Sequence, residues 1–300
     1  GTAPGMLGFL TPYANLGEVN SWGWELSLKW NDKIGKNFRY WATMNLSYNQ
    51  NKIIERKEAP QDNDYQYGKN HRIGSRSQYV FWRYYDESTP ELYEKTFNRP
   101  FHSVVLENGD AVYVDLNGDR KIDANDMSYD YGFTDDPEYM IGLNLGFSWK
   151  NWEVNTQWTG AWNVSRMISD VFRQPFVSSA GSNAGGLLSY HLDHTWTPEN
   201  PSQSAEYPRA TQVNASNNYA TSTLFEKDAK YLRLKTLQVA YNFQFPLMKK
   251  LGLTTCQLAF SGYNLLTFSP YLWGDPEATA SNAPTYPLTK TYTLSLKLGF

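Results

Sequence analysis

The chain has 300 residues, a net charge of −3 and a pI near 5.9. This acidic balance, with no basic stripe along the sequence, argues against nucleic acid as a partner. Aromatic residues make up 16% of the chain. No apolar run approaches the 18 or so residues of a membrane-spanning helix, but a membrane barrel, whose strands need only about ten alternating residues, remains open.

Apolar and polar residues alternate along much of the chain, as in strands with one apolar and one polar face. The first such stretch is Trp22–Trp30, and after the polar turn "NDKIGKN" the pattern resumes over Phe38–Asn49. Trp41 is the exception, because it falls on the polar face of its strand. Five further strands are predicted at Tyr139–Trp149, Trp152–Trp162, Tyr231–Phe245, Thr255–Phe268 and Thr291–Phe300. Cys256, which lies in one of them, is expected to be a buried or lipid-facing small apolar residue.

Aromatic residues recur at both ends of the apolar faces, as at Trp22 and Trp30 or Tyr139 and Trp149. Tyr and Trp favour the boundary between membrane and water, where a ring and a polar tip are both satisfied. Paired aromatic girdles indicate a transmembrane antiparallel β-barrel, so the fold class is all-β. A soluble antiparallel sandwich also has one apolar and one polar face and is the alternative.

The connections between the predicted strands alternate between short and long. Those after Trp30, Trp149 and Phe245 are short, whereas those after Asn49, Trp162 and Phe268 are long. Bacterial barrels have short periplasmic turns and long extracellular loops. Seven strands cannot close such a barrel, and an open edge in lipid is not viable. Together with the lack of a starting Met and of a signal peptide, this predicts that the chain is part of a larger barrel.

The first long connection contains "DLNGDRKIDANDM", with the ligand spacing of a calcium-binding loop. Its predicted ligands at positions 1, 3, 5, 7, 9 and 12 are Asp115, Asn117, Asp119, the carbonyl of Lys121, Asp123 and Asp126. Arg120 stands where the motif has Gly, and position 12 is Asp rather than Glu. An acidic turn without an ion is the alternative to a structural Ca²⁺ site.

Two other groups in the loops are candidates for binding. The stretch "YVFWRYYDES" places Trp82, Tyr84 and Tyr85 beside Arg83, and exposed rings next to charged groups suit sugar binding. Packing of these rings within the loop is the alternative. His191 and His194 are three residues apart, but the sequence supplies no third ligand, so both are interpreted as ordinary loop residues. No arrangement of nucleophile, histidine and acid is visible, and the chain is not expected to be an enzyme.

The chain resembles the C-terminal region of the SusC/RagA class of TonB-dependent outer-membrane transporters of Bacteroidetes. Seven stretches carry the resemblance in the family's order and span most of the chain: "NLGEVNSWGWELSLKW", "YVDLNGDRKIDANDM", "YMIGLNLGFSWKNWEVNTQWTG", "HTWTPENP", "YLRLKTLQVAYNFQFP", "GYNLLTFSPYLWGDPE" and "YTLSLKLGF".

The resemblance implies a 22-stranded barrel of which residues 1–300 form the C-terminal portion, with the plug and N-terminal domains lying upstream. It also implies a SusD-like surface lipoprotein that lids the barrel, energy from the TonB–ExbB–ExbD complex, and oligosaccharides as substrates, with peptides in some members. The outer-membrane barrel assembly machinery would recognise the terminal Phe300. Polar residues expected to line the lumen are Asn45, Asn144, Gln157 and Gln238.

Three further alternatives follow from the residues. A passive porin would share the barrel but lack the plug and the lid. An outer-membrane enzyme would need a catalytic set in its loops. A secreted, calcium-braced lectin-like sandwich would be soluble without detergent.

Overall fold

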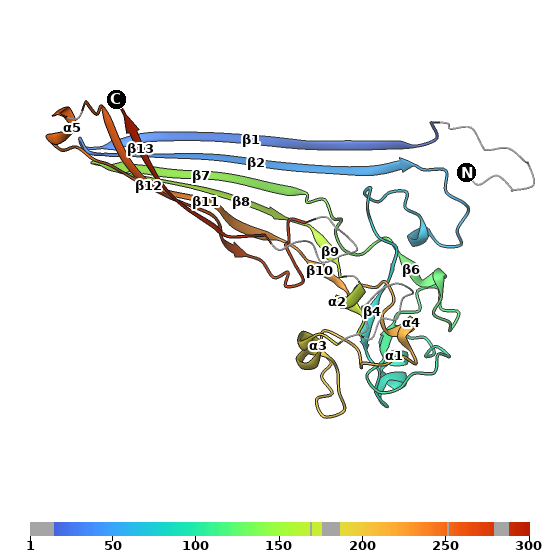
Figure 1. The fold of residues 1–300 in the computed structure, drawn as a ribbon. Coiled ribbons are helices and arrows are strands. Elements are labelled where there is room, and N and C mark those ends of the chain that lie inside the picture. Colours follow the sequence, from blue (N-terminus) through green and yellow to red (C-terminus); the bar gives the residue numbers. More distant parts are fainter. Residues whose placement is uncertain (1–14, 169, 176–186, 251, 279–287) are drawn as a thin grey trace, which may run out of the picture.

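One curved antiparallel sheet and a cluster of loops at one of its ends make up the chain (Figure 1). The computed structural model describes residues 15–168, 170–175, 187–250, 252–278 and 288–300. Within these residues, seven long strands pair in the order β1-β2-β7-β8-β11-β12-β13, every pair antiparallel. The predicted all-β class and its strand order along the chain are therefore confirmed.

The strands of the main sheet are β1 (Glu18–Ile34), β2 (Phe38–Glu55), β7 (Tyr139–Trp149), β8 (Trp152–Trp162), β11 (Tyr231–Asn242), β12 (Thr255–Phe268) and β13 (Thr291–Gly299). Short elements of the connections are η2 (Asp64–Gln66), β3 (Gln78–Tyr79), β4 (Phe81–Tyr84), α1 (Thr89–Phe97), β5 (Ala111–Tyr113), η3 (Ala124–Asp126), β6 (Met127–Ser128), β9 (Ser165–Met167), α2 (Asp170–Arg173), α3 (Ser189–His194), α4 (Ala215–Asn218), β10 (Glu226–Asp228) and α5 (Leu247–Lys250).

The first two strands are longer than the alternation predicts. β1 continues to Ile34 beside the start of β2, and β2 continues to Glu55, where it pairs with Glu18. Both extensions are polar, with runs such as Asn49–Lys52, so the hydrophobic pattern does not reveal them. They form because the hairpin continues to pair beyond the apolar stretch, and in Figure 1 this hairpin runs furthest along the sheet.

The apolar face of the sheet is exposed rather than packed against a second layer. Leu145, Leu294 and Leu296 are 40%, 71% and 61% exposed. A water-soluble sandwich buries such a face, whereas a membrane barrel presents it to hydrocarbon. None of the helices in the described parts of the chain is long and apolar enough to cross a membrane.

Two aromatic belts border this apolar face. One belt is the cross-strand row Trp24, Tyr48, Tyr139 and Trp162, in which the Tyr139 and Trp162 rings stack 5.0 Å apart. The other belt is the row Phe38, Trp149, Trp152 and Tyr241. Ten residues of β2 separate the belts, which is about 33 Å along the strand. At a tilt of about 40° this corresponds to about 25 Å across the membrane, the height of the apolar band of outer-membrane barrels.

A bulge explains why β11 and β12 alternate less clearly in the sequence. Leu234 pairs with Trp158 and Thr236 with Gln157, so Lys235 is an extra residue on β11. Beyond the bulge the apolar positions of β11 shift from even to odd numbers. On β12 the matching irregularity contains Asn264, whose φ of 54° lies in the left-handed region. A bulge bends the strand and increases its twist, which helps a sheet to curve.

Trp41, the exception to the alternation, has a packing reason. It pairs with Gly146 of β7 on the polar face, and a Cβ placed on Gly146 would lie 2.4 Å from the Trp41 indole. The indole therefore occupies the space that a side chain at 146 would fill.

Candidate functional site

The long connections fold together into a loop cluster at the sheet end opposite α5 (Figure 1). Its apolar core combines Tyr84, from the β2–β7 connection, with residues of the β8–β11 connection such as Tyr207 and Phe225. Within this core Tyr84, Tyr207 and Phe225 are at most 1% exposed. Two connections that are far apart in sequence thus form one packed body, which defines the mouth of this part of the barrel.

The predicted calcium loop has the backbone of a ligand-wrapping turn. Asp115 Oδ2 accepts the Arg120 N–H at 2.8 Å, which joins positions 1 and 6 of the loop. Arg120 has a φ of 70°, so it adopts the left-handed conformation for which the motif normally has Gly. Asn117 Oδ1 accepts the Asp119 N–H and Asp119 Oδ1 accepts the Lys121 N–H, at 2.9 and 2.8 Å.

The predicted ligands of the loop all offer oxygen atoms, which fits a hard cation. Asp115 and Asp126 are buried, whereas Asp119 is exposed. Burial raises the pKa of Asp126, and the negative charge of Asp115 raises it further. Hydrogen bonds from backbone N–H groups lower this pKa, but they do not outweigh burial. Among the described residues, no three His, Cys, Asp or Glu side chains converge closely enough to hold a metal ion. Each carboxylate that accepts a backbone N–H keeps free lone pairs that a cation could use.

The aromatic stretch predicted to bind sugar is mostly packed inside the loop cluster. The expectation of an exposed ring is wrong for Tyr84, which is 0% exposed and donates its hydroxyl to the Ala205 carbonyl at 2.9 Å. Trp82 packs edge-on against the rings of Tyr93 and Phe97, each 5.3 Å away. The reason is that the two connections need a shared core, and these rings supply it.

The two other residues of this stretch are half-buried. Arg83 pairs with Asp86 at 2.5 Å and lies 5.6 Å from the centre of the Trp82 ring. Tyr85 lines an open groove of about 970 Å³ together with Asp86. Tyr85 thus keeps access to this groove, and Trp82 lines a second cavity of about 470 Å³ in the loop cluster.

The far wall of this groove comes from "HTWTPENP", one of the stretches that carry the family resemblance. Thr195, Trp196 and Glu199 line it, and Glu107 and Arg209 complete its charged rim. The Trp196 indole packs against Gly109, where a Cβ would lie 2.2 Å from the ring. Trp196 is only 6% exposed, so stacking on a substrate falls to Tyr85, while the carboxylates and the guanidinium can hydrogen-bond a polar oligomer.

A buried carboxylate, Asp110, holds one of the groove residues, Arg209, in place. Asp110 is 0% exposed and accepts hydrogen bonds from Arg209 Nε at 2.5 Å, Asn214 at 2.7 Å and Asn218 at 2.8 Å. Burial alone raises the pKa of Asp110, but these donors and the Glu107 N–H outweigh burial and lower it. Asp110 is therefore held as a carboxylate that fixes Arg209 at the groove rim.

Arginines join the connections to one another, and no pattern in the sequence indicates these pairs. Arg76 pairs with Glu226 at 2.7 Å and with Asp135 at 2.6 Å. Arg166 pairs with the same Asp135 at 3.1 Å and donates to the Pro276 carbonyl at 3.3 Å. All three long connections are linked in this way, so Asp135 has a structural role.

A third arginine anchors the last connection to the barrel wall. Arg233 of β11 is 2% exposed and pairs with Asp275 at 2.6 Å and Glu277 at 2.5 Å. Both acids belong to "GDPE", another stretch of the family resemblance. The signal in the sequence is the charged residue between two leucines in "YLRLK", which marks a polar-face position of the strand.

The four predicted lumen residues lie on the polar face, opposite the exposed leucines. Asn144 pairs with Gln157 across β7 and β8, and Gln238 follows on β11 beside Asn155. Asn45 accepts a hydrogen bond from Ser27 at 2.8 Å. This face therefore presents amides where the barrel would enclose water.

The two loop histidines serve packing. His191 is 1% exposed and bonds the Phe172 carbonyl at 3.1 Å, while the His194 ring stacks on Tyr190 at 3.8 Å. Their interpretation as ordinary loop residues agrees with these contacts.

Relatives of known type match the chain over almost its whole length. TonB-dependent receptor P26 of Formosa agariphila is 28% identical over all of this chain, and receptor P3 of the same organism is 24% identical over 99% of it. TonB-dependent receptor SusC of Bacteroides thetaiotaomicron is 25% identical over 95% of it. The matches cover 31%, 30% and 27% of these proteins, so the chain spans under a third of their length. No family model matches the chain.

Solved structures agree in fold. The RagAB peptide importer in its open-open state has a TM-score of 0.72 at 20% identity, and the match covers 99% of this chain and 30% of that one. The closed-closed state of RagAB gives a TM-score of 0.71 at 21% identity. The SusC match in sequence and the RagAB match in fold thus agree with each other.

The sequence matches and the shared fold both support a TonB-dependent transporter of the SusC type. This SusC/RagA-type chain is an outer-membrane protein, and its sheet is a segment of a transmembrane β-barrel. The two aromatic belts then mark the two membrane boundaries. The loop cluster lies at the extracellular end, and the short turns with α5 lie at the periplasmic end.

Proposed function

We propose that this chain forms part of the wall and the mouth of an importer that carries oligosaccharides across the outer membrane. In this proposal residues 1–300 are the C-terminal portion of one barrel domain of 22 strands, and the plug and N-terminal domains belong to an upstream part. The observation that carries it is the match to TonB-dependent receptors over 95–100% of the chain for P26, P3 and SusC. The groove beside Tyr85 and the amide-lined polar face support a polar, oligomeric substrate.

The proposed cycle needs two partners. A SusD-like lipoprotein closes over the loop cluster and holds the substrate against the mouth. The TonB–ExbB–ExbD complex then pulls on the plug and opens a path past Asn45, Asn144, Gln157 and Gln238. The arginine links between the connections support this cycle, because a lid needs a mouth of fixed shape. The chain itself carries out no covalent chemistry in this scheme.

A peptide is the second candidate substrate. The observation that favours it is the similarity in fold to RagAB, which is described as a peptide importer. Glu107 and Glu199 at the groove rim would suit a cationic peptide as well as sugar hydroxyls. A passive porin is less well supported, because the similar chains are receptors of the TonB-dependent type.

The proposal includes one structural Ca²⁺ that stabilises the first long connection. Its ligands would be Asp115, Asn117, Asp119, the Lys121 carbonyl, Asp123 and Asp126.

The C-terminal residue has a role in assembly in this proposal. Phe300 is 86% exposed beyond β13, and the barrel assembly machinery recognises it.

Growth experiments test the proposed function. A strain that lacks the gene is compared with its parent on a panel of glycans and of peptides as sole nutrients. The proposal expects loss of growth on one class of glycan, and the same loss when TonB is removed. Loss of growth on peptides alone would replace the first candidate by the second, and unchanged growth on every nutrient would refute both.

Variants restored to the deletion strain separate transport from assembly. Tyr85→Ala should slow uptake of the affected nutrient while the protein remains in the outer membrane at the level of the wild type. Tyr67→Ala is the matched control, because Tyr67 belongs to the same connection and does not line the groove. Equal effects of the two changes would argue against the groove as a substrate contact.

A further inference from the structure

Two neighbouring turns form a continuous rim at the periplasmic end. The β1–β2 turn contains Lys36, and the β7–β8 turn contains Lys150. The backbone N–H of Lys150 donates to the Asn37 carbonyl at 3.0 Å, which fixes the two turns side by side. Both lysines are exposed. The structure therefore places two cationic side chains on adjacent turns at the membrane boundary.

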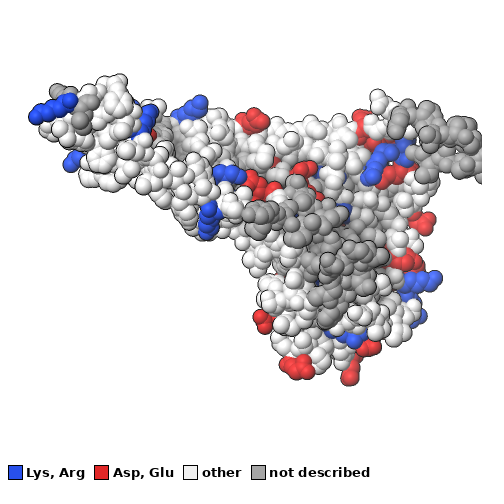
Figure 2. Space-filling view, in the orientation of Figure 1, with Lys and Arg blue, Asp and Glu red and all other residues white. Residues whose placement is uncertain are grey.

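These cations form no ion pair with a described residue, whereas several arginines of the loops do. Among the described residues, none of the basic side chains near this rim forms an ion pair: Lys33, Lys36, Arg39, Lys150, Lys250 and Lys297. In the loop cluster, by contrast, arginines such as Arg76, Arg166 and Arg209 are paired. Figure 2 shows blue side chains at the end of the sheet that carries α5. Their charge is thus available to a partner outside the chain.

One of the two lysines is directed toward the membrane side of the rim. Lys150 Nζ lies 5.1 Å from the centre of the Trp149 ring. Trp149 belongs to the periplasmic aromatic belt and is 49% exposed on the apolar face. An ammonium above a belt tryptophan lies at the depth of the lipid headgroups, where long basic side chains place their charge.

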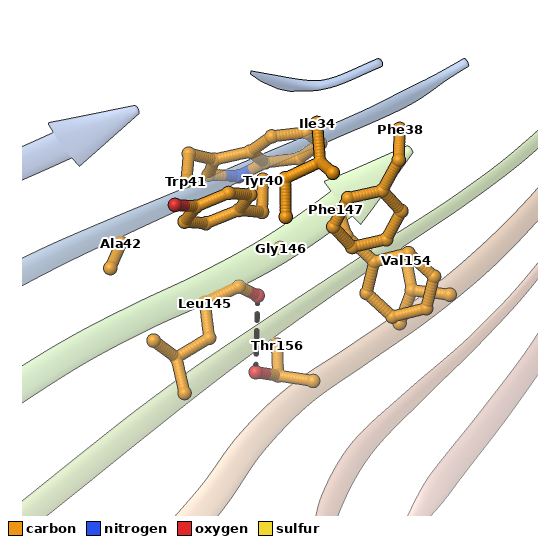
Figure 3. Close-up of a pocket in the computed structure, with 10 residues that line it drawn as sticks. All are labelled: Ile34, Phe38, Tyr40, Trp41, Ala42, Leu145, Gly146, Phe147, Val154 and Thr156. Carbon is orange, nitrogen blue, oxygen red and sulfur yellow. Dashed lines mark hydrogen bonds between the residues drawn. The ribbon is translucent and has the colours of Figure 1, made fainter. Parts of the chain in front are cut away.

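An apolar groove of about 520 Å³ begins at this rim (Figure 3). Its walls include Phe38, Phe147 and Val154. Its floor lies at Ala42 of β2 and Gly146 of β7, two small residues on neighbouring strands. It runs from the row of Phe38 to the row of Ala42, four residues or about 13 Å of strand.

The lining of this groove is mainly apolar. Two of its residues, Tyr40 and Thr156, carry a hydroxyl, and Thr156 Oγ1 donates to the Leu145 carbonyl at 3.2 Å, the dashed line in Figure 3. A donor that already has its acceptor adds little cost when an apolar chain covers it.

We propose that this rim and groove form a binding site for an anionic phospholipid of the inner leaflet of the outer membrane. Lys36 and Lys150 hold the headgroup phosphate, and one acyl chain lies in the groove between Phe38 and Phe147. Charge complementarity selects the headgroup, since two unpaired ammonium groups meet one phosphodiester. The depth of the site selects the inner leaflet, because the short turns lie on the periplasmic side.

Lipid binding to the purified full-length transporter tests this site. The protein in a mild detergent is titrated with phosphatidylglycerol or phosphatidylethanolamine of the same acyl chains, and bound lipid is counted by native mass spectrometry. The wild type should bind phosphatidylglycerol about 30-fold more tightly, the factor expected for two lysines at a headgroup. The variant K36Q/K150Q should lose this preference, and K36R/K150R should keep it.

Two controls keep the result specific. K95Q/K290Q removes two lysines from the opposite end and should leave the preference unchanged. Ala42→Leu fills the floor of the groove and should weaken binding of both lipids, while the unfolding temperature shows that the barrel is intact. The proposal is overturned if the wild type shows no headgroup preference, if K36Q/K150Q retains it, or if a second copy of the protein rather than lipid covers the groove.

Discussion

Arg233 on β11 and Asp275 in the β12–β13 connection form a buried ion pair, with 2.6 Å between Nη2 and Oδ1. Arg233 also donates from Nε to Thr267 at 3.0 Å and pairs with Glu277. Removing one partner of a buried ion pair destabilises the protein, because the other charge stays buried without compensation. Arg233 is therefore the buried side chain that attaches the last connection to the barrel wall.

Replacing this arginine should release the connection without disrupting the barrel. Arg233→Gln leaves Asp275 without its partner, and breaking a buried pair costs about 3–5 kcal/mol. Hydrogen exchange of residues 270–278 should accelerate by more than about 100-fold, while exchange in β7 and β8 stays slow. Lys235→Gln is the matched control, because Lys235 pairs with the same Glu277 at 36% side-chain exposure and an exposed pair contributes about 0–1 kcal/mol. Equal effects of the two variants would contradict the anchoring role.

Calcium should protect the loop that contains Asp115 and Asp126. If the ion binds, its free energy of binding adds to the stability of the ordered loop. Millimolar Ca²⁺ should slow proteolysis and hydrogen exchange over residues 115–127, and a chelator should reverse the effect. The variant D119N/D123N removes two charged ligands and should abolish the response to Ca²⁺. If hydrogen exchange over residues 115–127 of the wild type were the same with Ca²⁺ and with chelator, the loop would be an acidic turn that binds no ion.

Arg120 should be a site where glycine stabilises the loop. Its φ of 70° is a left-handed conformation that costs a residue with a Cβ about 1–2 kcal/mol. Arg120→Gly should therefore slow local exchange across the loop by about fivefold or more, and it should raise any affinity for Ca²⁺. Arg120→Ala removes the same side chain but keeps the Cβ, so it should give no gain. A gain of the same size from alanine would show that the charge, rather than the backbone, was responsible.

The sequence predicts the barrel wall far better than the loops, for a physical reason. In a wall strand, alternation and aromatic ends are imposed by the membrane, so Tyr139–Trp149 and Trp152–Trp162 are predicted with the bounds that the structure has. Where lipid does not constrain the chain, as in the polar end of β2 up to Glu55, the pattern fades although pairing continues.

The loop cluster depends on contacts between distant segments, which periodicity does not encode. Tyr84 was predicted to be exposed because its neighbours are aromatic and charged, yet it is buried through contact with residues more than 100 positions away. Arg76 and Glu226 are 150 positions apart, so their pairing is equally invisible. By contrast, the oxygen spacing from Asp115 to Asp126 is local, and hydrogen bonds such as that from the Arg120 N–H to Asp115 Oδ2 lie within this segment.

Acid should loosen the loop cluster through Asp110. Hydrogen bonds from Arg209, Asn214 and Asn218 lower the pKa of this buried carboxyl despite the opposing effect of burial. An unfolded Asp titrates near about 3.9, so on acidification the unfolded chain takes up this proton before the folded one. The stabilisation from Asp110 is therefore complete above about pH 5 and is lost progressively as the pH falls through about 3.9 toward the lower folded pKa.

A comparison of two variants isolates this contribution. Asp110→Asn should destabilise the cluster by about 1–3 kcal/mol near pH 7, because Arg209 loses its charged partner. In the wild type, residues 214–219 should lose protection from hydrogen exchange between pH 5 and pH 3, after correction for intrinsic rates. In Asp110→Asn this pH dependence should be smaller. Asp193→Asn is the control, since Asp193 is exposed on α3 and forms no ion pair with a described residue, and it should keep the wild-type pH dependence. If Asp110→Asn retained the full acid sensitivity of the wild type, another carboxyl would have to hold the groove rim in place.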